Sequence, residues 1–129
     1  MINHEIMNEV PIAMIQTTRL RRLLLALALR RRSLALLRAE PRVALTILAG
    51  GDVAVTAHGR AAVVAEPMRA SDGVAAIALD VDELQDHGRT TFVIDAGVRW
   101  RWVDADAERT DAAVRAELLR LARARRPAP

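Results

Sequence analysis

Three consecutive arginines and a serine are the residues of this sequence best suited to chemistry: Arg30, Arg31, Arg32 and Ser33, here called the basic turn. A short apolar segment with helical spacing follows them and ends at Pro41. Guanidinium groups form paired hydrogen bonds to phosphate oxygens, and a helix start adds free backbone N–H groups and the positive end of the dipole. The pattern predicts a site for a phosphorylated ligand. The plain alternative is a solvated basic turn in which the serine caps the helix.

The composition excludes several classes of chemistry. All 19 basic residues of the 129-residue chain are arginine, so no lysine is present to form a Schiff base or a Walker-type phosphate loop. The absence of cysteine excludes disulfides, thiolate metal sites and cysteine nucleophiles, and it fits a reducing, cytoplasmic location. The longest apolar run, residues 23–29, is far shorter than the roughly 20 residues that cross a bilayer. We therefore expect no membrane partner.

The remaining polar residues give weaker signals. The three histidines lie far apart in the sequence and lack metal-ligand spacing, so we predict no metal site. Neither Ser33 nor Ser71 lies in a nucleophile-elbow motif, and no catalytic residue is assigned. The net charge of +3 is modest, and two tryptophans and one phenylalanine are the whole aromatic inventory. Both features disfavour nucleic acid as a partner.

Hydrophobic periodicity predicts a mainly β protein with flanking helices, folded as one domain over residues 1–129. Residues 1–9 and 126–129 show no clear period, and we expect them to fray. Strands are expected at residues 10–15, 23–28, 43–48, 53–64, 74–81, 90–94 and 98–103, of which the last two would form a hairpin.

Local signals mark a turn and a bend. Residues 49–52 contain two glycines and predict a hairpin turn. Gly59 interrupts a long apolar strand, which is typical of a bulge. Residues 99–102 alternate arginine with tryptophan, so the two tryptophans share one strand face and the two arginines the other. We expect the tryptophans to pack in the core and the arginines to face water.

Two helices are predicted, and a third is an alternative to a strand. A short helix follows the basic turn, and a longer one begins after Asp104, with acidic residues at its start and arginines at its end, as the helix dipole favours. The alternative joins residues 18–37 in one long basic helix, because leucine and arginine both favour helices. Such a helix would suit nucleic acid binding. We prefer the strand at residues 23–28.

Three motifs resemble those of a known family. Residues 37–45, just after the basic turn, have the sequence LRAEPRVAL; residues 58–64 have HGRAAVV; and residues 87–92, HGRTTF, lead to WRW at 100–102. Together with the order of elements, these motifs resemble the pyridoxamine 5'-phosphate oxidase-like family, the flavin-binding split β-barrels. The resemblance covers about residues 10–122.

The resemblance implies a six-stranded split β-barrel of the FMN-binding kind that forms a homodimer. FMN or a deazaflavin would lie at the seam and act on a small-molecule substrate, which makes the chain a flavin-dependent oxidoreductase. Residues 30–33 would bind the phosphate, and Arg101 would be a further cofactor contact. Family members often carry an arginine-lysine pair where this chain has Arg32 and Ser33, and they place another strand ahead of residues 10–15. These departures favour the alternative, a non-catalytic dimeric split-barrel protein with weak or no cofactor binding.

Overall fold

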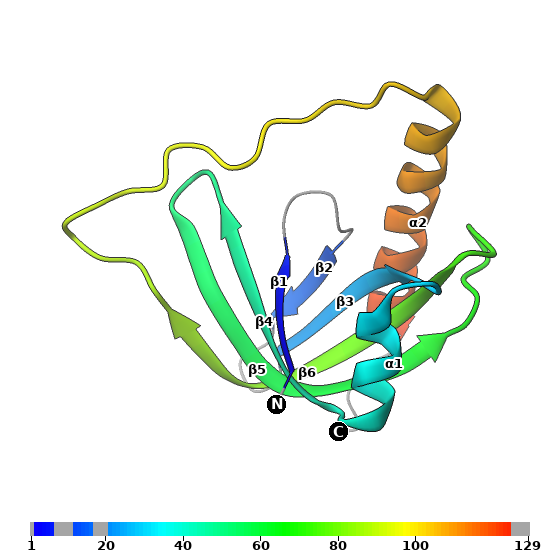
Figure 1. The fold of residues 1–129 in the computed structure, drawn as a ribbon, viewed down its shortest axis with the longest axis horizontal. Coiled ribbons are helices and arrows are strands. Elements are labelled where there is room, and N and C mark those ends of the chain that lie inside the picture. Colours follow the sequence, from blue (N-terminus) through cyan, green and yellow to red (C-terminus); the bar gives the residue numbers. More distant parts are fainter. Residues whose placement is uncertain (1, 7–11, 17–20, 125–129) are drawn as a thin grey trace.

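The structure is a computed structural model that describes residues 2–6, 12–16 and 21–124. Strands and two helices make up this part of the chain (Figure 1). In chain order they are β1 (Ile2–Ile6), β2 (Ile12–Gln16), β3 (Arg21–Ala28), α1 (Arg32–Ala39), β4 (Arg42–Ala49), β5 (Val53–Ala65), β6 (Val74–Asp86) and α2 (Ala105–Ala124).

The strands form one sheet in the order β1-β4-β5-β6-β3-β2. Its four central strands, β4, β5, β6 and β3, pair antiparallel with one another and curl into a half-barrel (Figure 1). At the edges, β1 pairs in parallel with β4, and β2 pairs antiparallel with β3. The predictions of a mainly β protein and of a C-terminal helix are confirmed.

Strand β3 is buried on both faces, and this decides between the strand and the long helix. Leu23, Leu25 and Leu27 belong to the core cluster that includes side chains of α1, whereas Leu24 and Ala26 belong to the cluster that includes side chains of α2. All eight residues of the strand are in register with β6. The helical alternative is therefore wrong for residues 21–28, because strand pairing and burial outweigh the weak helix propensity of leucine and arginine. Residues 18–20 lie outside the described part.

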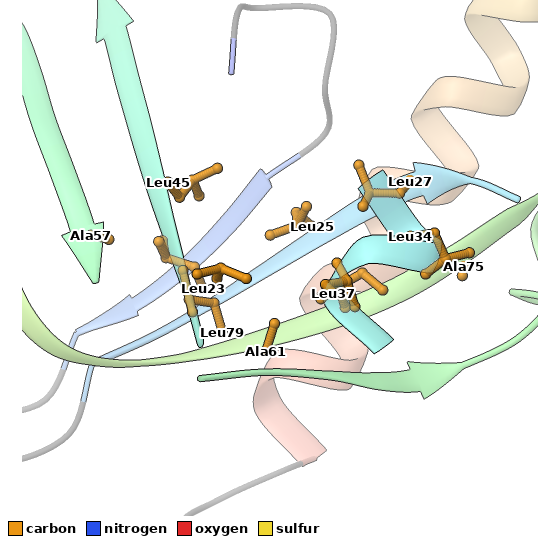
Figure 2. Packing of buried hydrophobic residues seen from close by; sticks show 12 residues of the cluster. Leu23, Leu25, Leu27, Leu34, Leu37, Leu45, Ala57, Ala61, Ala75 and Leu79 are labelled. Atoms are coloured by element: carbon orange, nitrogen blue, oxygen red, sulfur yellow. The ribbon is translucent and has the colours of Figure 1, made fainter. Parts of the chain in front are cut away.

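The two helices cover opposite faces of the sheet, here called the α1 face and the α2 face. On the α1 face, Leu34 and Leu37 pack among leucines and alanines of the strands (Figure 2). On the α2 face, Val114 and Leu118 pack against a second set of buried strand residues. Asp104 caps α2, since its Oδ1 accepts hydrogen bonds from the N–H groups of Asp106 (2.9 Å) and Ala107 (3.4 Å).

A buried carboxylate ties α2 to the loop between β5 and β6. Glu117 is 5% exposed. Its Oε2 accepts a hydrogen bond from the backbone N–H of Arg69 (3.1 Å), and its Oε1 accepts one from that of Ala70 (2.7 Å). These bonds satisfy two backbone donors of the loop and compensate in part for burying the charge.

The turn and the bulge predicted from glycines are both present. Between β4 and β5, Gly51 and Asp52 have positive φ angles of 77° and 61°, as the predicted tight turn needs. Between β5 and β6, the register shifts at His58 and Gly59. A Cβ on Gly59 would lie 2.0 Å from the backbone oxygen of Asp80, so only glycine allows the two strands to approach this closely.

Three expectations need correction. The hairpin predicted between residues 90–94 and 98–103 is wrong: β6 continues to Asp86, only an isolated bridge joins Arg89 to Phe92, and residues 93–104 form no strand in the structure. Residues 2–6, expected to fray, form β1 in register with β4. A strand thus precedes β2, although the sequence predicted none there. Residues 7–9 and 126–129 lie outside the described part.

We expect Gly59→Ala to lower the free energy of unfolding by about 3 kcal/mol, because the new methyl group meets backbone atoms that cannot move aside without opening the β5–β6 ladder. Urea denaturation measures the loss. Gly73→Ala is the matched control, since a Cβ at Gly73 meets nothing within 4 Å. Equal stabilities of the two variants would contradict the close approach at the bulge.

Replacing Glu117 by glutamine should lower the free energy of unfolding by about 2 kcal/mol, because an amide NH₂ would then face a backbone N–H that has lost its acceptor. Glu83→Gln, at an exposed position of β6, should change stability by less than about 0.5 kcal/mol. Denaturant titrations of both variants make the comparison. A neutral Glu117→Gln would show that the two hydrogen bonds contribute nothing net.

Candidate functional site

The basic turn lies between β3 and α1 and is held by backbone hydrogen bonds. The N–H of Arg31 donates to the carbonyl oxygen of Ala28 (2.9 Å), and that of Leu29 donates to the carbonyl oxygen of Gly73 (2.8 Å). The side chains of Arg30, Arg31 and Arg32 are exposed. Within the described residues, none of these three arginines forms an ion pair with a carboxylate. Three guanidinium groups are therefore available to an anion.

Helix α1 begins inside the basic turn. Its N-cap residue is Arg31, with extended backbone angles and no side-chain capping bond, and its first turn contains no acidic residue. Helical geometry leaves the N–H groups of Arg32 and Ser33 without an acceptor inside the helix. The expectation that Ser33 caps α1 is thus wrong, because the helix starts one residue before it. The uncapped end leaves N–H groups and positive dipole charge beside the arginines.

Arg101 does not join these residues. It is exposed and lies in the extended segment of residues 93–104. Figure 1 shows this segment in yellow, arching past the β4–β5 turn to the start of α2, apart from α1. The structure therefore brings together four of the predicted contacts, Arg30, Arg31, Arg32 and Ser33. It places the fifth, Arg101, in a different part of the fold.

The two tryptophans are not core residues, which corrects a further expectation. Trp100 is 43% exposed and Trp102 is 36% exposed. Their ring centroids are 4.9 Å apart and the rings are nearly perpendicular, at 83°, which is the edge-to-face geometry that aromatic pairs prefer. The rings contact one another because the hairpin that would have carried them into the core does not form.

A hydrogen-bonded chain of side chains links three segments near the β4–β5 turn, and sequence analysis missed it. The hydroxyl oxygens of Thr46 and Thr56 are 2.9 Å apart, and the Thr56 hydroxyl lies 2.7 Å from Nε2 of His87. Thr56 is 7% exposed. The two threonines are register partners on β4 and β5, so the predicted hairpin could have placed them side by side. Nothing in the sequence indicated that His87 returns to them.

This chain of groups can relay a proton, but it lacks the third member of a nucleophilic triad. In the described part, no carboxylate hydrogen-bonds to the other ring nitrogen of His87. His58 contacts Gln85 at 3.5 Å rather than His87. Among residues 2–6, 12–16 and 21–124, no group of three or more histidine, cysteine, aspartate or glutamate side chains could hold a metal ion. We regard the chain of hydrogen bonds as a structural link.

A row of charged residues crosses the sheet at the Gly59 bulge. Arg60 lies opposite Arg42 on one side and Asp80 on the other. Arg22 Nε donates to Asp80 Oδ1 at 2.7 Å, and Arg42 lies 3.6 Å from Asp82. The Arg60 of the HGRAAVV motif thus belongs to a surface charge network, in which positive and negative groups largely balance.

The interior of the half-barrel holds a small cavity on the α1 face. Its volume is about 20 Å³, and only apolar side chains line it: Leu25, Leu27, Leu37, Val43, Leu45, Ala61, Ile77 and Leu79. The space is far too small for a flavin ring, and it offers no hydrogen-bonding group. A cofactor ring would therefore need a slot outside the core.

Comparison with known proteins gives no assignment: no family model matches the sequence, and no curated protein matches it. No helix in the described part is long and apolar enough to cross a membrane. The site is accordingly judged on its own geometry.

Thr56→Val tests the link to His87. Because valine has nearly the same shape and no hydroxyl, His87 and Thr46 both lose a partner, and we expect the free energy of unfolding to fall by about 2 kcal/mol. Thr46→Val removes only one of the two bonds and should cost about half as much. Chemical denaturation of both variants measures the difference. Equal losses would contradict a central role for Thr56.

Proposed function

We propose that this chain is a subunit of a split-barrel flavoprotein of the pyridoxamine 5'-phosphate oxidase-like kind, which binds FMN or a deazaflavin through its phosphate and acts as an oxidoreductase on a small molecule. One observation carries the proposal: three arginines that form no ion pair with any described residue, and a helix start without a side-chain cap, converge at residues 30–33. The curled antiparallel sheet, with a helix between β3 and β4, agrees with such a barrel.

The residues present fit the phosphate end of the cofactor. The guanidinium groups of Arg30, Arg31 and Arg32 would neutralise a dianionic phosphate, and the Ser33 hydroxyl and two free backbone N–H groups would donate hydrogen bonds to its oxygens. The flavin ring, when bound, would supply hydride transfer. In this proposal the basic turn anchors and orients the cofactor, and the protein's own groups take no covalent part.

The cavity that the described residues form on the α1 face does not accommodate the ring end of the cofactor. The cavity on the α1 face is small and apolar, so the ring would lie against a second copy, which is why the proposal includes a homodimer. The small size of this cavity also supports the second candidate function, a dimer without catalytic activity. A non-catalytic dimer would bind a phosphorylated ligand weakly at the basic turn, or bind none, and would hold no flavin.

Comparing FMN with riboflavin tests the proposal, because the two differ only in the phosphate. We expect FMN to bind at least about tenfold more tightly, a difference of about 1.4 kcal/mol, as measured by quenching of flavin fluorescence. Arg31→Ala combined with Arg32→Ala should abolish this preference and leave riboflavin binding unchanged. Arg120→Ala, at an exposed position of α2, is the control and should keep the preference.

Two outcomes would count against the flavoprotein. If FMN and riboflavin bind equally, the basic turn is not the phosphate site. If saturating FMN changes neither fluorescence nor melting temperature, while inorganic phosphate raises the melting temperature of the unmodified chain only, the non-catalytic alternative is correct.

A further inference from the structure

Ser33 carries a hydroxyl group that the described part of the fold leaves without a hydrogen-bond partner. It is the second residue of α1 and is half-buried. A serine at a helix start ordinarily caps a backbone N–H group, but here the cap position belongs to Arg31, whose side chain makes no capping bond. The Ser33 hydroxyl is therefore free for another role.

The residues that surround Ser33 in the sequence suit recognition by a protein kinase. Arg30, Arg31 and Arg32 precede it directly. Kinases of the arginine-directed class read basic residues just before the acceptor serine, because carboxylates of the kinase pair with guanidinium groups. The three arginines are exposed and form no ion pair with a described carboxylate. The acceptor lies in the first turn of α1, and the ends of helices open most easily.

The other serine of the chain, Ser71, has different surroundings. One arginine precedes it by two positions, Arg69, and Asp72 follows it directly. The Asp72 carboxylate would repel the acidic groups with which such a kinase reads its substrate. Ser71 therefore serves as a matched control for Ser33.

A phosphate on Ser33 would meet the same groups that the basic turn offers to a free phosphate. It carries nearly two negative charges at neutral pH and three acceptor oxygens. The backbone N–H groups of Arg32 and Ser33 have no acceptor inside the helix, and the first turn of α1 contains no acidic residue to repel an anion. The phosphate would thus supply the missing cap of α1 and engage the guanidinium groups beside it.

We propose that Ser33 is a phosphorylation site and that its phosphate closes the basic turn to phosphorylated ligands. In the reaction, the γ-phosphorus of ATP gains a bond to Ser33 Oγ and loses its bond to the oxygen that it shares with the β-phosphorus. ADP leaves, and the hydroxyl proton passes to a base of the kinase. The closing of the site rests on the proposed function, whereas the modification and the capping of α1 do not.

Incubating the purified chain with ATP and an arginine-directed serine kinase tests the modification, and intact mass spectrometry measures it. We expect the unmodified chain to gain one phosphate, Ser33→Ala to gain none, and Ser71→Ala to gain one. Circular dichroism checks that both variants are folded. No phosphate on the unmodified chain, or equal incorporation into Ser33→Ala, would overturn the site.

Thermal unfolding tests the capping of α1. The phosphorylated chain should melt about 3 °C above the unmodified chain, because the phosphate satisfies free N–H groups and reduces the repulsion among the arginines. Treatment with a phosphatase is the control and should return the melting temperature to its original value. A phosphorylated chain that melts at or below that temperature would show that the basic turn does not hold the phosphate.

The FMN and riboflavin titrations test the closing of the site. Phosphorylation of Ser33 should remove the preference of about tenfold for FMN and leave riboflavin binding unchanged. A preference that survives complete phosphorylation would overturn the closure. An unmodified chain without any preference for FMN would contradict the proposed function instead, and the mass and melting measurements would still decide whether Ser33 is modified and its phosphate held.

Discussion

Burial of β3 on both faces is the constraint on which the rest of the structure depends. Its leucines contact the α1 cluster on one side and the α2 cluster on the other. With water excluded from both sides, its backbone groups need partners within the sheet, and β6 and β2 supply them. The strand ends at Ala28, and the next residue, Leu29, donates its backbone N–H to the carbonyl oxygen of Gly73. The basic turn is thus positioned by the core, although its own side chains point to solvent.

The shape of the sheet follows from close approaches that larger side chains would prevent. At Gly59 the backbones of β5 and β6 come together at the bulge, and a bulge bends and twists the strand that carries it. Beyond the end of β5, Glu117 fixes the loop that returns the chain to β6. The curl that places α1 and α2 on opposite faces therefore depends on two residues. Gly59 allows the close approach of β5 and β6, and the buried Glu117 holds the loop between them.

What the sequence predicted correctly is local in origin. The β4–β5 turn, the bulge at Gly59 and the capped, dipole-matched α2 each arise from residues within a few positions of one another. The wrong predictions concern residues whose placement depends on distant partners. Trp100 and Trp102 alternate as strand residues do, but no strand of the described part pairs with them. Likewise, the bond between Thr56 and His87 spans 31 positions, and no periodicity could have revealed it.

The candidate site shows the same difference between features set by neighbouring residues and features set by distant partners. Adjacency in sequence was enough to predict that residues 30–33 lie together. The helix begins two residues earlier than it would with Ser33 as its N-cap, and this start depends on the turn that follows β3, which is bonded to Gly73. Arg101 was joined to them through family resemblance alone, and the fold places it in the extended segment of residues 93–104.

The position of Arg101 separates it from residues 30–33, with which the family resemblance had grouped it as a cofactor contact. The segment of residues 93–104 lies apart from α1 (Figure 1), so Arg101 is not one of the groups beside the basic turn of its own chain. The basic turn and the segment of residues 93–104 are therefore distinct surfaces, each with its own arginines. The α1 face is filled by apolar side chains, so both surfaces lie at the rim of the sheet, where their charged groups are solvated.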